Sequence, residues 1–307
     1  MSASELGPAR RVLAVVVTHN SAADVGGLLD SLGPAQRSGS LGEVVVVDNG
    51  STDDTVAILR ARPGVTVVEA TNRGYSAGFN LGVRVGGSAD YLLLLNPDCR
   101  MATDAIQTMV TAAERSLAGI VVPRIHDAHG RLQYSLRREP TIRRGIGLNF
   151  TRHPVFAEYI NSDVDYEQAQ DVDWALGAAM LIRQECYSAL GGWDESFFLY
   201  SEETDFCLRA RDAGWSTRYE PAAVVVHAGG GSGRNAMTHT MQVVNRVRCY
   251  GRRHPRPLTY AYLIANLVSE ASWVVRGRRE SREAVAALVC PRRRPAALRS
   301  QGAIIPG

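Results

Sequence analysis

The chain has 307 residues, which is enough to bury a sizeable core as one large domain or as a domain with an appendage. Its 45% hydrophobic and 21% charged residues are ordinary for a globular protein and exclude a fibrous or mostly disordered chain. A formal net charge of +3 is too small to indicate binding of nucleic acid. Lysine is absent from the sequence, and such exclusive use of arginine is typical of a GC-rich genome.

Five scattered cysteines, odd in number and without a C-x-x-C spacing, argue against a disulfide framework and against a structural zinc site. The first residues lack a basic segment followed by an apolar one, so we expect no secretory signal. The longest nearly uncharged stretch, 258–267, is shorter than the roughly 20 residues that a membrane-spanning helix needs. These features predict a cytoplasmic protein.

The first 122 residues alternate between strand-like and helix-like patterns. Continuous, β-branched apolar runs predict strands buried on both faces of a parallel sheet, at residues 12–17, 44–47, 65–68, 91–95 and 120–122. Helix-like segments lie between them, at 22–32, 53–61, 76–85 and 103–115. This alternation predicts an α/β fold with a doubly wound, mostly parallel sheet.

The second half of the sequence is less regular. The pattern weakens from residue 124 to about residue 170, where we expect a hairpin near Gly130. Regularity returns at 172–183, followed by a helix at 201–214 and a strand at 223–226. Everything after about residue 237 looks helical, and arginines are concentrated between residues 276 and 299.

Polar side chains follow the first two predicted strands: Thr18 and Asn20 after one, Asp48 and Ser51 after the other. Ligands of open parallel sheets bind outside the carboxyl ends of the strands, so these residues predict a binding site. The G-x-G-x-x-G signature of a dinucleotide site is absent. A carboxylate such as Asp48 can accept from the imide N–H of uracil or thymine, although capping of the next helix is an alternative role.

Two further blocks lie at the next strand ends. Gly74 and Gly78 would let a ligand approach the backbone, and the helix N-terminus beside them favours an anion. Asn96 and Asp98 end the next apolar run. Because a hard divalent cation that also binds substrate phosphates needs only one or two carboxylates, Asp98 is a candidate metal ligand. Each block alone is also typical of a turn.

The ordered series Thr-His-Asn at 18–20, Asp-Asn-Gly-Ser-Thr-Asp at 48–53, Asn-Arg-Gly-Tyr-Ser-Ala-Gly-Phe-Asn at 72–80 and Asn-Pro-Asp at 96–98 resembles glycosyltransferase family 2. Matching blocks follow at 173–180, 192–198, 202–209 and 227–232. The resemblance implies a GT-A fold that holds a nucleotide-sugar and a divalent metal. It also implies a catalytic domain at 1–235, with a donor half (10–122) and an acceptor half (123–235), and a basic helical region at 236–307.

The resemblance implies a role for each matching residue. Asp98 and His227 would bind Mg²⁺ or Mn²⁺ on the donor diphosphate, with the loop Gly229–Gly233 covering the phosphates. Asp173 and Trp174 would face the acceptor sugar. The donor-binding residues would be Thr18, Asn20, Asp48, Ser51, Gly74, Asn80 and Asn96.

Glu203 stands where the family has its catalytic base, although the usual residue there is aspartate. It would deprotonate the acceptor hydroxyl for a single displacement that inverts the anomeric centre, and Glu202 is the alternative base. A carboxylate in the first turn of a helix is stabilised as the anion, which a general base requires. The other interpretation is that these acids only favour a helix N-terminus.

Within the family, the details most resemble bacterial rhamnosyltransferases. This implies transfer of L-rhamnose from dTDP-L-rhamnose to a polyprenyl-diphosphate-linked N-acetylglucosamine, in assembly of the cell-wall arabinogalactan linker. Galactofuranosyl or mannosyl transfer and a non-catalytic nucleotide-sugar-binding module are alternatives. A sugar-1-phosphate nucleotidyltransferase is disfavoured, because it would need a glycine-rich, basic loop after the first strand.

The C-terminal region bears on the location of the protein. Leu258–Val275 carries aromatic and aliphatic side chains, and the segment after it is densely basic. Amphipathic helices of this composition lie at membrane interfaces and attract anionic headgroups. We therefore expect peripheral contact with the inner face of the plasma membrane; a packed appendage, a solvated tail or a homodimer contact are the alternatives.

Overall fold

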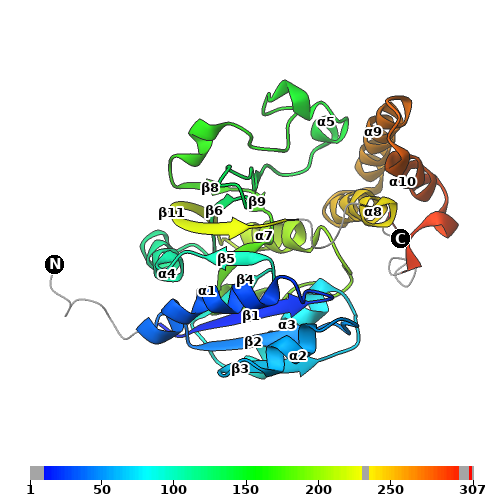
Figure 1. Ribbon diagram of the computed structural model, residues 1–307. Helices are drawn as coiled ribbons and strands as arrows, with labels where there is room; N and C mark the ends of the chain where they lie inside the picture. Colours follow the sequence, from blue (N-terminus) through cyan, green and yellow to red (C-terminus); the bar gives the residue numbers. More distant parts are fainter. Residues whose placement is uncertain (1–9, 230–234, 297–303, 306–307) are drawn as a thin grey trace.

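The computed structural model describes residues 10–229, 235–296 and 304–305 (Figure 1). Nine strands form one mixed sheet with the order β3-β2-β1-β4-β10-β6-β11-β5, and β8 pairs with β11. The names donor half (10–122) and acceptor half (123–235) are kept from the expectation above as labels for these two parts of the chain. The donor half contributes four parallel strands at one end of this order. These are β1 (Val12–Thr18), β2 (Glu43–Asp48), β3 (Val65–Glu69) and β4 (Tyr91–Leu95).

The parallel strands are covered by helices on both faces. Alternate residues of β1 belong to different core clusters, Val16 to one and Val17 to the other, so the continuous apolar run is buried on both sides as predicted. Leu28 and Ile106 pack into the first cluster and Phe79 into the second. The covering helices are α1 (Val25–Ser38), α2 (Thr55–Arg60), α3 (Tyr75–Gly86) and α4 (Ala105–Ser116).

The acceptor half completes the same sheet. A strand from this half, β10 (Ala179–Arg183), lies antiparallel between β4 and β6 (Ile120–His126). The prediction that residues 120–122 simply continue the parallel series is therefore incomplete, because β10 separates this strand from β4. The last long strand, β11 (Thr217–His227), is parallel to β6 and antiparallel to β5 (Cys99–Met101) and β8 (Gln170–Val172).

The strand predicted at 223–226 is only the second part of β11. Its pairing with β6 shifts register between Glu220 and Val224, and Pro221 lies within this bulge. A proline cannot donate to the ladder, and a bulge is one of the few places where a strand tolerates it. The hairpin expected near Gly130 is confirmed: Gly130 has a φ of 78°, and Asp127 N donates to Arg131 O at 2.8 Å.

Short elements shape the acceptor half. The helix predicted at 201–214 is confirmed as α7 (Glu202–Asp212), with ends that differ by one or two residues. A two-stranded sheet pairs β7 (Leu136–Arg137) with β9 (Trp174–Ala175). The remaining elements are α5 (Ile142–Gly145), α6 (Gln184–Ala189) and the 3-10 turns η2 (Asn149–Thr151) and η3 (Asp163–Tyr166).

Three helices, α8 (Ala236–Arg253), α9 (Arg256–Val275) and α10 (Arg279–Val289), pack around a third apolar cluster beside the acceptor half (Figure 1), and η4 (Pro291–Arg293) follows them. Arg246 Nη2 lies 2.9 Å from the buried carboxylate of Glu158, which ties α8 to that half. A Cβ at Gly145 of α5 would lie 2.9 Å from the Tyr262 ring of α9, so the two helices are in close contact. No helix within the described ranges is long and apolar enough to cross a membrane.

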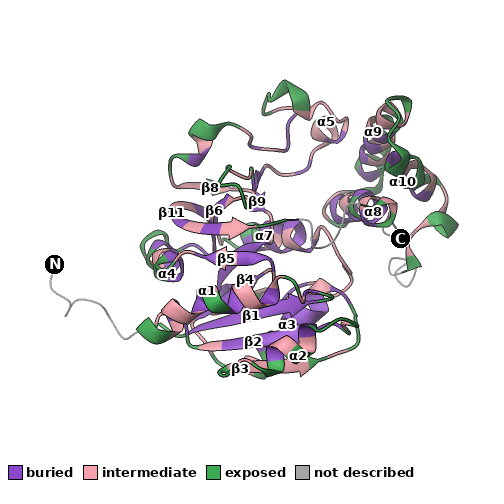
Figure 2. Ribbon diagram, viewed as in Figure 1, coloured by how far each residue is buried: buried purple, intermediate pink, exposed green. Residues whose placement is uncertain are grey.

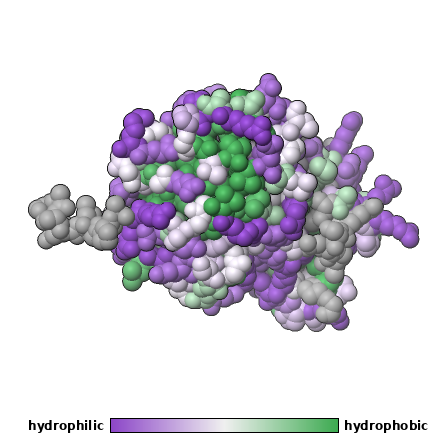
Figure 3. All heavy atoms as spheres, turned by 90° about the horizontal axis from the view of Figure 1, so that it is seen from below, coloured by the Kyte–Doolittle hydropathy of each residue, from purple (hydrophilic) through white to green (hydrophobic). Residues whose placement is uncertain are grey.

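The opposite side of the molecule ends in β3, the free edge of the sheet. Val65 and Val67 pack with Ile58 of α2 against the first core cluster, and Val68 packs against the second. These side chains are only partly buried, and apolar side chains gather in a patch on the face seen from this side (Figure 3). The central strands β1 and β4, in contrast, are buried at every residue (Figure 2).

Candidate active site

The buried carboxylate of Asp48 joins the carboxyl ends of β1 and β2. Asp48 Oδ1 accepts from Thr18 Oγ1 at 3.0 Å and from the Ser51 hydroxyl, and Asp48 Oδ2 accepts from Ser51 N at 2.8 Å. Ser51 Oγ in turn accepts from Asn20 N at 2.8 Å. Asn20 has a φ of 53°, a left-handed conformation that asparagine tolerates better than most residues. Four residues predicted for donor binding thus form one cluster.

This cluster leaves Asp48 able to accept a further hydrogen bond. Each carboxylate oxygen has two acceptor positions, and Oδ2 uses one of them on Ser51 N. The alternative role, capping of α2, is excluded for Asp48, because α2 begins only at Thr55. The N-cap residue of α2 is Asp54, and the side chain of the preceding Asp53 accepts from Thr55 N at 3.1 Å.

Gly74 is used inside the fold, contrary to the prediction that it lets the donor approach. Its φ is 102°, and a Cβ there would lie 2.5 Å from Phe198 O. The N–H of Tyr75 donates to the same carbonyl at 2.8 Å. Gly78 likewise faces Val17, whose Cγ1 would lie 2.8 Å from an added Cβ. Protein atoms, rather than a ligand, therefore explain both glycines.

Asn80 also serves the fold rather than the donor. Its Nδ2 donates to Trp193 O at 2.8 Å and to Glu195 Oε1 at 3.2 Å, while its Oδ1 accepts from Tyr187 OH at 2.8 Å and from Trp193 N at 3.1 Å. These four bonds fill the hydrogen-bonding capacity of the amide, which is 5% exposed. Asn80 fastens α3 to the segment that leads into α7, and its predicted role is corrected accordingly.

Asp98 and His227 come together because β5 pairs with the end of β11, with Cys99 opposite His227. His227 Nε2 lies 3.3 Å from Asp98 Oδ1. Two ligands that each lie about 2.1 Å from an octahedral cation are about 3 Å apart, so this pair fits Mg²⁺ or Mn²⁺. Burial opposes ionisation of Asp98, but the hydrogen bond and charge of His227, with nearby backbone N–H groups, outweigh it and lower the pKa of the carboxyl.

Cys99 is the third potential ligand in this cluster, whose candidate ligand atoms all lie within 4.8 Å of one another. Its thiol is fully buried and donates to Ala178 O at 3.2 Å. Burial raises the pKa of this thiol well above its usual range, so the thiol stays protonated. Hard cations also prefer oxygen to sulfur, which leaves Asp98 and His227 as the fitting pair.

Gln133, which the sequence analysis did not identify, fixes the imidazole of His227. Its Nε2 donates to His227 O at 2.9 Å, which orients the amide so that Oε1 lies 3.1 Å from His227 Nδ1. With an oxygen facing it, Nδ1 keeps its proton when a cation displaces the proton of Nε2, and the lone pair of Nε2 would then be available to that cation. This is the tautomer that a metal ligand needs. Gln133 lies in the irregular segment, 94 residues before its partner, where no pattern marks it.

The acid pair lies in the first turn of α7. Two non-glycine residues with positive φ, Tyr200 (68°) and Ser201 (71°), lead directly into it, and such strained backbone is concentrated at functional sites. Glu202 is buried and Glu203 only partly so. One carboxylate oxygen of each, Oε2, has no hydrogen-bond partner within the described part of the chain. Each of these oxygens is thus a buried acceptor whose hydrogen-bonding position is unfilled.

Burial dominates the ionisation of these acids. It raises the pKa of Glu203 to about 7, against a smaller lowering by its own backbone N–H and by the charge of Arg137. Burial and the neighbouring charge of Glu203 raise the pKa of Glu202 further. The expected stabilisation of the anion by the helix N-terminus is present as the backbone N–H contribution, but burial outweighs it. A pKa near neutrality still suits a general base.

Tyr75 links the acid pair to the metal candidate. Its hydroxyl donates to Asn96 Oδ1 at 2.8 Å. Burial raises the pKa of this phenol, and the charges of Glu202 and Asp98 raise it further. Asn96, which was predicted to bind the donor, therefore contacts Tyr75, whose pKa depends on the charges of both Glu202 and Asp98.

Asp173 and Trp174 are more enclosed than predicted. Asp173 Oδ2 accepts from Glu139 N at 2.8 Å, and Oδ1 lies 3.0 Å from Arg211 Nη1. The Trp174 ring is part of the second core cluster, and its N–H donates to Arg138 O at 3.0 Å. The prediction that Trp174 faces the acceptor is corrected on this ground, whereas the partly exposed Asp173 keeps its predicted role as a hypothesis.

Comparison with known proteins shows the family to which the chain belongs. Residues 13–176 match the profile of glycosyl transferase family 2. The chain belongs to glycosyltransferase family 2. The matched range includes Asp48 and Asp98 and ends before Glu203 and His227.

Two relatives of this glycosyltransferase are rhamnosyltransferases. The chain is 31% identical over 215 residues to the N-acetylglucosaminyl-diphospho-decaprenol L-rhamnosyltransferase of Mycobacterium tuberculosis, covering 64% of this chain and 70% of the relative. It is 33% identical over 145 residues to the rhamnosyltransferase WbbL of Escherichia coli, covering 45% and 52%. The family recognised in the sequence is therefore confirmed.

Solved structures of other glycosyltransferases share the fold. The mannosyltransferase PcManGT of Pyrobaculum calidifontis, in complex with GDP-Man and Mn²⁺, has a TM-score of 0.57 at 17% identity, over 95% of this chain and 83% of that one. GalNAc-T7 with UDP, GalNAc and Mn²⁺ has a TM-score of 0.58 at 15% identity, over 78% and 47%. These matches confirm the predicted GT-A fold.

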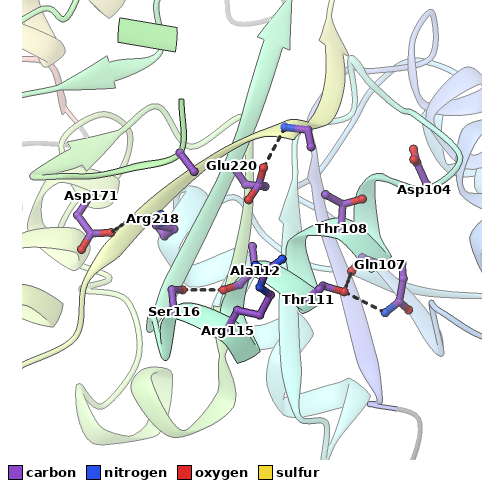
Figure 4. Close-up of a pocket in the computed structure, with 12 residues that line it drawn as sticks. Asp104, Gln107, Thr108, Thr111, Ala112, Arg115, Ser116, Asp171, Arg218 and Glu220 are labelled. Atoms are coloured by element: carbon purple, nitrogen blue, oxygen red, sulfur yellow. Dashed lines mark hydrogen bonds and ion pairs between the residues drawn. The ribbon is translucent and has the colours of Figure 1, made fainter. Parts of the chain in front are cut away.

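One groove of the glycosyltransferase, of about 710 Å³, lies apart from these residues, between α4 and the first part of β11 (Figure 4). Arg218 and Asp171 form an ion pair of 3.2 Å at its side, and Glu220 accepts from Ala222 N. None of the predicted site residues lines it. Of the predicted loop Gly229–Gly233, residues 230–233 fall outside the described residues.

Proposed function

We propose that this glycosyltransferase moves L-rhamnose from dTDP-L-rhamnose to a polyprenyl-diphosphate-linked N-acetylglucosamine, in arabinogalactan-linker assembly. The observation that carries the proposal is the 31% identity, over 70% of its length, to a mycobacterial relative named for this donor sugar and acceptor type. The Asp48 cluster supports it, because a buried carboxylate with a free acceptor position suits the imide N–H of thymine.

The proposed divalent cation, Mg²⁺ or Mn²⁺, would be held by Asp98 and His227. When bound, such a cation neutralises charge that develops on a leaving diphosphate. Gln133 would keep the His227 ring in the ligating tautomer, and the N–H groups that lower the pKa of Asp98 would keep its carboxylate ionised. The presence of Mn²⁺ in the two solved glycosyltransferases supports a divalent ion.

Glu203 is the proposed base of an inverting displacement. Its unpartnered oxygen would take the proton of the acceptor hydroxyl as that oxygen attacks the anomeric carbon. The bond from this carbon to the diphosphate oxygen breaks on the opposite face, and the electron pair leaves with the diphosphate. Glu202, whose Oε2 is also unpartnered but which is more deeply buried, is the second candidate.

The acceptor lipid would bring the enzyme to the inner face of the plasma membrane as a peripheral protein. We also propose that residues 1–235 form the catalytic domain, with donor and acceptor halves, and that the helices after residue 235 form a region that approaches the membrane. A homodimer contact through the same helices is the competing arrangement.

Transfer from radiolabelled dTDP-L-rhamnose to a short-chain prenyl-diphosphate-linked N-acetylglucosamine, with Mn²⁺ or Mg²⁺, tests the proposed function. We expect transfer with inversion and thermal stabilisation by dTDP above that by UDP or GDP. Transfer only from a UDP-galactofuranose or GDP-mannose donor would replace the rhamnosyl assignment. Binding of dTDP without transfer to any acceptor would favour the non-catalytic module.

A further inference from the structure

The outer face of α9 is an uncharged stripe. Between Pro257 and Val275 the one charged residue is Glu270, which is buried and lies 2.9 Å from His239 Nε2. Tyr260, Ile264 and Val268 are 53%, 58% and 54% exposed, although such side chains are usually buried. We define the α9 stripe as the exposed residues Pro257, Tyr260, Ile264, Val268, Ala271 and Val275.

These residues recur every three or four positions and therefore lie on one side of the helix. The opposite side packs into the helical cluster through buried residues such as Tyr262 and Asn266. α9 has 20 residues, so the stripe is about 30 Å long. Continuous apolar faces of this kind mark an interaction surface on a globular protein.

Basic side chains flank the stripe at both ends. Arg276 and Arg278 lie over the ring of Trp273, with their Cζ atoms 4.9 and 4.0 Å from its centroid. Arg279 and Arg282 are exposed at the start of α10, and Arg256 is exposed at the other end. Two exposed acids, Glu280 and Glu283, lie among these five arginines, so the surroundings of the stripe are net positive.

This charge pattern decides between the two candidate occupants, a second copy of the chain and a lipid surface. In a twofold pair of α9 helices that pack side by side along the whole stripe, parallel or antiparallel, an arginine-bearing end lies against another one. Such juxtaposed like charges disfavour self-association through the stripe. A bilayer with anionic headgroups attracts both ends and accepts the apolar residues between them.

α9 is joined through α5 to the part of the chain that contains the acid pair. α9 contacts α5 at Gly145, and the segment before α5 carries Glu139, which lies 3.0 Å from Arg211 of α7. The acid pair opens the same helix, α7. The stripe itself faces away from α5, because Gly145 contacts Tyr262 and Asn266 on the opposite side of α9.

We propose that the α9 stripe binds the surface of an anionic bilayer, with the helix lying flat among the headgroups. The choice of a bilayer as partner rests on the proposed function in one respect only: a polyprenyl-linked acceptor would lie in the membrane. The binding itself is a property of α9 and its flanking arginines, and can be measured without any substrate.

The test is co-sedimentation of the full chain with vesicles of phosphatidylglycerol and phosphatidylcholine, beside vesicles of phosphatidylcholine alone. We expect at least about tenfold tighter binding to the anionic vesicles, weakening as salt is raised. Ile264→Glu with Val268→Glu should lower the affinity about tenfold or more, because a charge replaces the buried contact. Arg279→Gln and Arg282→Gln should each lower it up to about fivefold.

Val164→Glu is the matched control, because Val164 is 77% exposed on η3 and should leave vesicle binding unchanged. The proposal is overturned if the double variant binds as the parent does, or if neutral and anionic vesicles bind equally. It is also overturned if the parent is a dimer that the double variant dissociates, since a second copy then occupies the stripe.

Transfer to a short-chain, water-soluble acceptor separates this proposal from the proposed function. The double variant should keep the kcat of the parent on that acceptor, which also shows that it is folded. If the parent transfers no sugar to that acceptor, the proposed function is wrong, but the result of the vesicle-binding experiment is unaffected. Equal transfer by parent and double variant to an acceptor embedded in anionic vesicles would remove the α9 proposal alone.

Discussion

Gln133 and His227 hold each other through two hydrogen bonds, one to the imidazole Nδ1 (3.1 Å) and one to the backbone carbonyl (2.9 Å). The pair makes the orientation of the His227 ring, and so of the nitrogen that would bind the proposed cation, depend on the side chain of Gln133. Ligand orientation of this kind typically contributes about 10–100-fold to metal affinity.

Gln133→Leu should therefore weaken Mn²⁺ binding about 10–100-fold, measured by titration calorimetry or electron paramagnetic resonance in the presence of nucleoside diphosphate. The matched control is Gln107→Leu, because Gln107 lies on the exposed side of α4 and bonds only its neighbour Thr111. Unchanged Mn²⁺ affinity in Gln133→Leu would show that the amide does not position the histidine.

Glu203→Gln should lower kcat about 10²–10⁴-fold, because the amide cannot accept the proton of the acceptor hydroxyl. The donor KM should change little, since the Asp48 cluster is untouched. Glu202→Gln, made in parallel, distinguishes the two acids: the larger loss identifies the base. If both variants transfer sugar at the parental rate, neither acid is the base.

The rate should fall as pH drops below about 7, since burial raises the pKa of Glu203 to about 7 and the protonated acid cannot act as base. A pH–rate profile at saturating donor should show a limb that falls about tenfold per pH unit on the acid side. The residual activity of Glu203→Gln should lack this limb. An acid limb of the same midpoint in the variant would assign the titration to another group.

The same raised pKa predicts a pH-dependent stability. The folded state binds this proton more tightly than the unfolded chain, so the associated stability is complete at pH 4 and below and is lost as pH rises through about 7. Glu203→Gln should therefore exceed the parent in free energy of unfolding by on the order of 1–3 kcal/mol at pH 8.5. Urea unfolding at pH 5.5 and 8.5 measures this; an equal difference at both values would contradict it.

Asn80→Ala should destabilise the fold and spare the donor site. Removal of the amide leaves the buried N–H and O of Trp193 without a partner, at about 1–3 kcal/mol for each group. Urea unfolding should record the loss, while the donor KM stays at the parental value at a temperature where the variant is folded. Asp48→Asn provides the contrast, with an expected rise in donor KM.

Three strands of the donor half, β1, β2 and β4, could be predicted because they are buried on both faces and are therefore continuous apolar runs; β3, at the edge, is only partly buried but is also largely apolar. β10 is just as apolar, but its place depends on pairing with β4, more than 80 residues earlier in the chain, which leaves no local signal. The Asp48 cluster could be predicted for a similar local reason, since parallel strands bring their carboxyl ends to one edge.

Gly74 and Asn80 show where prediction from the sequence ends. A glycine at a strand–helix junction admits a close neighbour, and the pattern is the same whether that neighbour is a phosphate or the carbonyl of Phe198. Likewise, the presence of an asparagine on a helix does not predict whether its amide binds a ribose or the backbone of Trp193. Gln133 gave no signal, because it lies in a segment without periodicity.

The antiparallel insertion of β10 also governs the order in which the chain can fold during synthesis. Until residue 183 has left the ribosome, β4 has an open edge of five apolar residues, all fully buried in the finished protein. Such an edge is a template for wrong pairing with another nascent chain. The two halves consequently share one sheet, and a fragment that stops at residue 176 would lack the strand that covers the edge of β4.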